Sequence, residues 1–173
     1  MTVTIVVVTG ASGAGKTAAV SALDARALPG VRCYYFDSIG IPSNEEMKRD
    51  FGSGENWQAI KTEQWLSLLA GDPDRAEVYI LDGQTRPSFI RSAATRLGLD
   101  HVHIVLLDCA PGVRHTRLVK GREQPELVNS QMDCWAAYLR GQADALDLPV
   151  IDTTSLGIDD VADALAAYVD KEM

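Results

Sequence analysis

The sequence has few cysteines and no run long enough to cross a membrane. Three cysteines in 173 residues, an odd number without the spacing of a metal site, exclude a disulfide framework. We expect Cys33, Cys109 and Cys134 to be thiols in or near the core of a cytoplasmic protein. No stretch approaches the ~20 apolar residues of a membrane span. The apolar start of the chain also lacks the basic residues of a signal peptide, because the first basic residue is Lys16.

Positive charge is scarce as well. Sixteen Lys and Arg residues against 24 Asp and Glu residues give a net charge of −8, which argues against nucleic acid or an anionic membrane as a partner. Seven of those basic residues nevertheless lie between Arg86 and Arg122, and such a local cluster suits a small polyanion. The length and the 46% hydrophobic content predict one domain over residues 1–173, present as a monomer or homodimer.

One motif in the sequence is specific. The stretch "GASGAGKT", residues 10–17, lies between an apolar β-branched run and a segment with helical periodicity, and it fits the pattern G-x-x-x-x-G-K-[ST]. Turns of this kind let backbone N–H groups curl around phosphate oxygens at a helix N-terminus. We expect Lys16 to reach the β- and γ-phosphates and the Thr17 hydroxyl to bind Mg²⁺. The residues predicted to bind ATP are Gly10, Ser12, Gly13, Ala14, Gly15, Lys16 and Thr17.

The alternation of apolar runs and amphipathic segments predicts an α/β fold. We expect strands over 3–8, 31–36, 77–82, 102–107 and 148–151, and helices over 16–27, 57–70, 87–97, 111–119, 125–146 and 158–171. Strands separated by helices form a parallel sheet with helices on both faces. Because ligands bind beyond the carboxyl ends of such strands, the polar residues that follow each strand are the candidates for chemistry.

Two aspartates follow predicted strands. Asp37 comes directly after "YYF" and is a candidate general base, or orienting group, for a substrate hydroxyl that attacks the γ-phosphate, although "DSIG" is also good turn chemistry. Asp82 ends "YILD" and predicts a carboxylate that holds Mg²⁺ through water. The segment at about 38–70 has glycines and a proline around a short polar helix, which predicts a substrate-binding insertion. Trp57 and Trp65 within it are expected to be packing residues.

Glycine and arginine residues complete the candidate site. Gly83 permits close backbone approach, and Arg86 is a planar donor suited to an acceptor phosphate or carboxylate. Arg91 and Arg140, on the helices that follow, are further candidates for the same contact. The pair Arg117 and Arg122 predicts a short lid at about 117–126 that closes over the transferring phosphates. The alternatives are solvated surface arginines and a basic helix C-terminus favoured by its dipole.

The order of these features resembles that in the P-loop small-molecule kinases of the adenylate-kinase-like group. The features are the P-loop "GASGAGKT", the acid after the second strand, "LDGQTRP" and the arginine pair. Asp37 is similar to the acid of gluconate, shikimate and chloramphenicol phosphotransferases, and "LDGQTRP" resembles a turn of nucleoside monophosphate kinases. The resemblance implies a five-stranded parallel sheet in the order 2-3-1-4-5. It also implies that "VIDTTSLGIDDVADAL" holds the adenine-side loop, with Thr153 and Thr154 near the base.

These observations favour an ATP- and Mg²⁺-dependent kinase that phosphorylates a hydroxyl of a small metabolite or nucleoside-like acceptor. One alternative is a nucleoside monophosphate kinase in which Arg86, Arg91 and Arg140 grip the acceptor phosphate. Another is a regulatory nucleotide-binding protein or weak ATPase that needs no acceptor. The candidate catalytic residues are Lys16, Asp37, Arg117 and Arg122.

Overall fold

A central strand of β-branched residues organises the fold. In the computed structural model, which describes residues 3–172, all six residues of β1 (Thr4–Thr9) are buried. The other strands are β2 (Val31–Tyr35), β3 (Val78–Asp82), β4 (Val102–Asp108) and β5 (Val150–Asp152). They form one parallel sheet in the order β2-β3-β1-β4-β5, which confirms the predicted order. Residues 1, 2 and 173 of the expected single domain lie outside the described residues.

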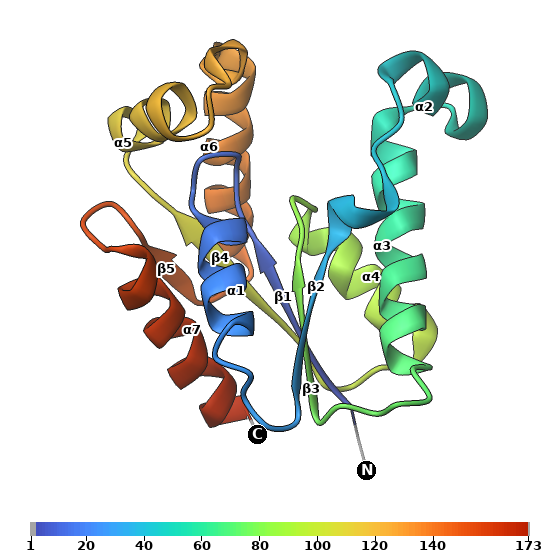
Figure 1. The fold of residues 1–173 in the computed structure, drawn as a ribbon. Coiled ribbons are helices and arrows are strands. Elements are labelled where there is room, and N and C mark those ends of the chain that lie inside the picture. Colours follow the sequence, from blue (N-terminus) through green and yellow to red (C-terminus); the bar gives the residue numbers. More distant parts are fainter. Residues whose placement is uncertain (1–2, 173) are drawn as a thin grey trace.

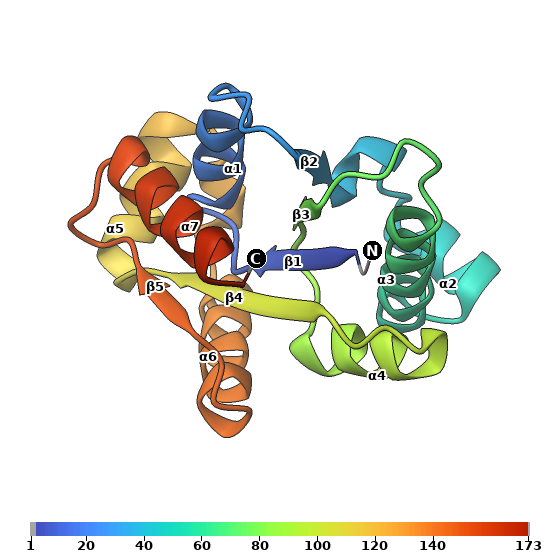
Figure 2. The same cartoon turned by 90° about the horizontal axis from the view of Figure 1, so that it is seen from below.

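Helices cover both faces of this sheet (Figures 1 and 2). On one face α1 (Lys16–Asp24) and α7 (Ile158–Glu172) pack on the strand residues Val6, Val8 and Val105. On the other face α3 (Gly54–Ala70) and α4 (Pro87–Leu97) pack on Ile5 and Val7, and α6 (Ser130–Ala145) packs on Leu106. Successive residues of β1 therefore pack on opposite faces of the sheet. This is the period of two expected for a sheet buried on both sides.

The remaining elements lie toward the carboxyl ends of the strands (Figure 1). They are α2 (Asn44–Phe51), α5 (Pro111–Thr116), 3₁₀ turns at Phe36–Ile39 and Pro125–Leu127, and a π-helical turn at Arg117–Gly121. The prediction of one helix over 125–146 is wrong at its start. Asn129 begins α6 by accepting a hydrogen bond from the Met132 N–H at 2.8 Å, so the preceding turn is separate.

Two burial predictions had different outcomes. Trp57 and Trp65 are both 6% exposed, as expected of packing residues. Cys109 is buried and Cys33 is half-buried, but Cys134 is exposed, so its prediction as a near-core thiol is wrong. Cys134 lies on α6, where the period of the helix turns Ala136, Leu139 and Ala143 to the sheet and Cys134 away from it. Over residues 3–172, no helix is both long and apolar enough to pass through a bilayer.

Candidate active site

The glycine-rich turn passes very close to the neighbouring backbone. A Cβ on Gly10, whose φ is +153°, would lie 2.3 Å from the carbonyl oxygen of Leu107 at the end of β4. Gly13 has φ +85°, and a Cβ there would lie 2.8 Å from Cγ of Arg114. Both positions therefore require glycine for backbone conformation and for space. The turn leads directly into α1, which begins at Lys16, so the N-terminus of that helix opens on the turn.

Lys16 is held inside the turn. Its side chain is buried, and Nζ donates a hydrogen bond to the carbonyl oxygen of Ala11 at 3.1 Å. Burial lowers the pKa of Lys16 to about 8, while the carboxylates of Asp82 and Asp37 act in the opposite direction and the guanidinium of Arg122 acts with burial. An anionic phosphate placed beside Nζ would supply the counter-charge that the amine lacks, and the ammonium form would then be favoured.

Thr17 and Asp82 form a pair of oxygen donors next to Lys16. The Thr17 hydroxyl donates to Oδ2 of Asp82 at 2.6 Å, although 65 residues separate them in the chain. Burial raises the pKa of Asp82, and the ammonium of Lys16 opposes that shift. Mg²⁺ prefers hard oxygen ligands and is typically bound by one or two protein oxygens together with waters and phosphates. The hydroxyl and carboxylate therefore fit a hydrated Mg²⁺.

A cavity of about 500 Å³ brings seven of the predicted site residues together. Asp37, which follows β2, opens into the same space as Lys16 and Asp82, from neighbouring strand ends of the parallel sheet. Arg122 reaches this space from the segment before α6. The cavity is lined by Ser12, Lys16, Thr17, Tyr35, Asp37, Asp82, Gly83, Gln84, Arg122 and Gln124. Tyr35, Gln84 and Gln124 were not predicted, although Gln84 lies within the "LDGQTRP" turn.

A second cavity of about 290 Å³ lies beside the glycine-rich turn. Arg117 lines this second cavity and not the first. Its guanidinium donates to Oγ1 and the carbonyl oxygen of Thr153, at 2.9 and 2.7 Å, and to the carbonyl oxygens of Gly13 and Ala14, both at 3.4 Å. The prediction that Arg117 closes over the transferring phosphates stays a prediction, and the contacts give this side chain a structural role. It ties the turn to the loop after β5, because those carbonyls occupy its donors.

Thr153 and Thr154 have different surroundings. Thr153 is buried and lines the second cavity with the apolar side chains of Leu156, Ile158 and Val161. Thr154 does not line it, because its Oγ1 accepts a hydrogen bond from the Ala110 N–H, the N-cap of α5, at 2.9 Å. A flat apolar base can lie in the second cavity while its phosphates extend to the glycine-rich turn.

Arg86 lies next to the first cavity but does not line it. Its Nη1 donates to Oε1 of Gln58 at 2.7 Å, and Nε2 of the same amide donates to the carbonyl oxygen of Gln84 at 3.0 Å. Nothing in the sequence pointed to Gln58, because a single glutamine in a predicted helix is an ordinary surface residue. In the structure its amide fixes the turn that follows β3 to helix α3.

Arg91 and Arg140 line neither cavity, so the structure does not bring them together with the other predicted site residues. Arg91 lines a hollow with Val102, at the start of β4 and therefore at the opposite end of the sheet. Arg140 is half-exposed and pairs with Asp144 at 3.0 Å and Asp108 at 3.7 Å. Its charge is therefore already paired with two carboxylates, one of them an i,i+4 partner on its own helix.

The predicted substrate-binding insertion at about 38–70 divides into two parts. Most of α3 is core, because Trp57, Trp65, Leu66 and Leu69 pack on the sheet. The preceding turn and α2 stand beyond the strand ends (Figure 1), and Ile39 and Ile41 are exposed there at 52% and 58%. Only this first part has the position expected of an acceptor-binding segment.

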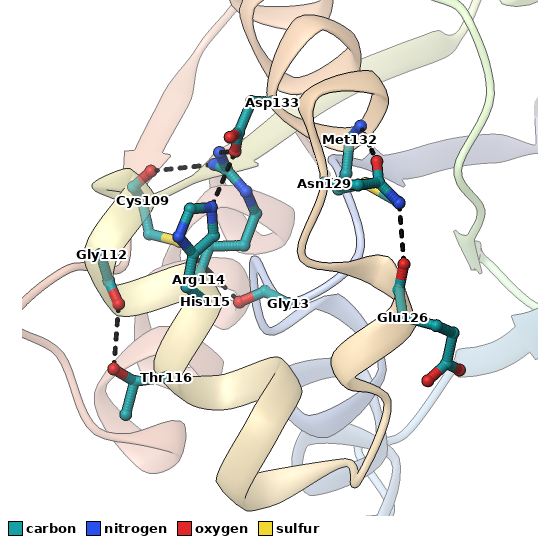
Figure 3. Close-up of polar contacts among 10 residues, drawn as sticks. All are labelled: Gly13, Cys109, Gly112, Arg114, His115, Thr116, Glu126, Asn129, Met132 and Asp133. Carbon is teal, nitrogen blue, oxygen red and sulfur yellow. Dashed lines mark hydrogen bonds and ion pairs between the residues drawn. The ribbon is translucent and has the colours of Figure 1, made fainter.

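A buried arginine fastens the two ends of the lid segment (Figure 3). Arg114 on α5 is 2% exposed and donates to Oδ1 of Asp133 at 2.6 Å and to the carbonyl oxygen of Cys109 at 3.4 Å. His115 contacts the same Oδ1 at 2.9 Å. Asp133 lies in the first turn of α6, so these contacts join the helix before the lid to the helix after it. We call Arg114, His115 and Asp133 the lid clamp. The aliphatic part of Arg114 also packs on Gly13.

We expect the lid clamp to make stability depend on pH in the acid range. The hydrogen bonds from His115 and Arg114 lower the pKa of the Asp133 carboxyl. Such a carboxylate stabilises the fold above its unfolded pKa of ~3.9 and loses this effect as the pH falls through the lower folded value. Asp133→Asn should therefore lower Tm at pH 7, and the difference from wild type should shrink as the pH falls below ~4.

Scanning calorimetry between pH 3 and 7 measures this difference. Asp170→Asn, at an exposed position of α7, is the matched control and should leave Tm close to the wild-type value throughout. A Tm difference for Asp133→Asn that stays constant over the whole pH range would contradict the role of the ionised carboxylate.

Comparison with known proteins finds similarity in structure and not in sequence. No family model matches the chain, and no curated protein matches it. The tunicamycin resistance protein of Deinococcus radiodurans has a similar structure, with TM-score 0.68, 22% identity, and 96% and 95% of the two chains covered. Shikimate kinase from Acinetobacter baumannii gives TM-score 0.59 at 16% identity, with 98% and 94% covered. Thymidylate kinase from Candida albicans gives TM-score 0.62 at 13% identity, with 98% and 92% covered.

The chain has the fold of the P-loop kinases. The sheet order and the similar structures agree on this, and each alignment runs over nearly the full length of both chains. The P-loop kinase fold accommodates different acceptors, since shikimate kinase and thymidylate kinase both have it. The fold alone therefore does not select an activity or an acceptor for this chain.

Proposed function

We propose that the protein transfers the γ-phosphoryl group of ATP to a hydroxyl of a small acceptor. One observation carries this proposal: the Asp37 carboxylate opens into the cavity that contains Lys16 and Asp82. A hydroxyl must lose its proton as the new O–P bond forms, whereas a phosphate acceptor is already ionised and needs no base. The arginines that would bind an acceptor phosphate, Arg86, Arg91 and Arg140, do not line that cavity.

The residues divide the work as follows. The Asp37 carboxylate orients the acceptor hydroxyl and accepts its proton as the oxygen attacks the γ-phosphorus and the bond to the β-phosphate oxygen breaks. Lys16, the N–H groups of the glycine-rich turn and Arg122 neutralise charge on the phosphates. Thr17 and Asp82 would hold Mg²⁺, which when bound neutralises charge on the β- and γ-phosphate oxygens. The second cavity receives the base, and Arg117 keeps its wall in place.

The direct test is release of ADP from ATP and Mg²⁺ in the presence of single acceptors. The panel contains sugars, nucleosides, amino sugars, aromatic alcohols and nucleoside monophosphates. Release that depends on a hydroxyl compound supports the proposal, and the phosphorylated product is identified by mass spectrometry. ADP release that requires a nucleoside monophosphate would show that the protein is a nucleoside monophosphate kinase. Slow ADP release that no acceptor changes would show that it is a weak ATPase or a switch protein.

Arg122 and Arg117 should respond differently to replacement by alanine. Arg122→Ala should lower kcat by ~10²–10³-fold with a smaller change in ATP affinity, because it removes a donor from the transferring phosphoryl group. Arg117→Ala should mainly weaken ATP binding, because its contacts support Gly13, Ala14 and Thr153 at the second cavity. Single-turnover kinetics and calorimetric titration of ATP separate these effects. Equal effects of the two variants on kcat would contradict the division.

A further inference from the structure

The end of the first cavity that remains for an acceptor carries no cation of its own. Among its lining residues Lys16 and Arg122 are the cations, and they lie close enough together for Arg122 to lower the pKa of Lys16. Both are next to Asp82, whose pKa they also influence. A bound triphosphate would engage both of them. Apart from Ser12 and Thr17 of the glycine-rich turn and Asp82, the lining residues left to contact an acceptor are Tyr35, Asp37, Gly83, Gln84 and Gln124.

Arg86, two residues after Gln84, is a further cation beside the cavity, and its charge is already compensated. The guanidinium lies over the rings of Trp135, Phe89 and Tyr138, with its central carbon 4.9, 5.2 and 5.8 Å from the ring centroids. Its two terminal nitrogens face Gln58 at 2.7 Å and the Glu55 carboxylate at 3.7 Å. A guanidinium held by aromatic faces, an amide and a carboxylate would lose these contacts if it turned into the cavity.

We propose that the acceptor is uncharged and that the site discriminates against carboxylates and phosphates. This inference rests on the proposed function, because it concerns the acceptor of that reaction. An anionic acceptor would approach the Asp37 carboxylate and the anionic triphosphate with no free cationic side chain of the cavity lining to balance its charge. Like charges brought together in a partly desolvated site are strongly disfavoured, whereas hydroxyl and amide groups can bond to Asp37, Gln84 and Gln124.

Pairs of compounds that differ in charge test this inference directly. The probes are glucose and gluconate, thymidine and thymidine 5′-monophosphate, and the methyl ester of shikimate and shikimate. Calorimetry with Mg²⁺ and a non-hydrolysable ATP analogue measures binding without any transfer. In every pair of which a member binds, the uncharged compound should bind at least ~10-fold more tightly than the anion.

Gln124→Arg supplies the missing cation at the wall of the cavity. This substitution should reduce the ratio of the anion's Kd to that of its uncharged partner by ~10-fold or more, since an arginine pairs with carboxylates and phosphates. The matched control is Gln131→Arg, which adds the same charge at an exposed position of α6 that does not line the cavity. This control should leave the preference unchanged. An equal shift in both variants would mean that overall charge, and not the cavity, sets the preference.

Failure of this inference differs from failure of the proposed kinase activity. Binding of anions as tight as that of their uncharged partners, or binding of no uncharged member of the pairs, would overturn the inference whatever the enzyme does. Tight binding of uncharged compounds without phosphorylation of any of them would instead refute the kinase activity and retain the charge preference.

Discussion

Asp37→Asn is expected to lower kcat by ~10²–10⁴-fold with the best acceptor found, while ATP binding is retained. The amide keeps the size and hydrogen-bonding reach of the carboxylate but cannot accept the hydroxyl proton. Rate measurements with saturating ATP and calorimetric titration of the nucleotide separate the two quantities. Asp170→Asn, an exposed aspartate on α7, controls for the change in net charge and should leave kcat unchanged.

Arg86→Ala is the companion measurement to Asp37→Asn. If the acceptor is a hydroxyl compound, the loss at Asp37 should be much the larger of the two, because Arg86 is engaged with Gln58 and three aromatic rings outside the cavity. A small loss at Asp37 beside a large loss at Arg86 would favour the nucleoside monophosphate kinase instead.

Lys16→Met is expected to reduce turnover by at least ~10²-fold and to weaken ATP binding, because it removes the cation from the β- and γ-phosphates. The same substitution should not reduce the stability of the fold. Burial of the amine is unfavourable enough to lower its pKa to about 8, so an apolar side chain of similar volume should maintain or raise Tm.

Thermal unfolding and ATP titration of the same Lys16→Met preparation therefore distinguish loss of function from loss of fold. Lys171→Ala, at an exposed position in the last turn of α7, is the matched control and should change neither quantity much. Wild-type ATP affinity in the Lys16→Met variant would refute the assignment of the glycine-rich turn to phosphate binding.

The fold and the centre of the site were accessible from the sequence because local rules determine them. The apolar run before "GASGAGKT" and the helical pattern after it fix a strand, a turn and a helix. A parallel sheet then brings the residues after neighbouring strands together, which is why Asp37 and Asp82 meet Lys16 in one cavity. These inferences needed periodicity, turn chemistry and the geometry of a parallel sheet. The strand order that makes these strands neighbours came from the resemblance to the P-loop small-molecule kinases.

The arginines were less predictable because their positions depend on partners distant in the chain. Arg117 and Arg122 are five residues apart, but after the π-helical turn Arg117 contacts Thr153 while Arg122 lines both cavities. Arg140 turns to Asp144 and Asp108, which compete with any ligand for its charge. Sequence spacing indicates which side chains can bind an anion. It does not say which of them already have a protein partner.

The lid clamp also determines where the chain should tolerate insertions and new ends. Because Arg114 and His115 meet Asp133, the residues between α5 and α6 form a loop whose ends are held together whatever lies between them. Doubling the length of such a loop costs only ~0.6 kcal/mol of closure entropy. Insertions near the 3₁₀ turn Pro125–Leu127 should therefore be tolerated by the sheet. A circular permutant with its new ends there should still fold, because the lid clamp holds α5 and α6 together after the chain between them is opened.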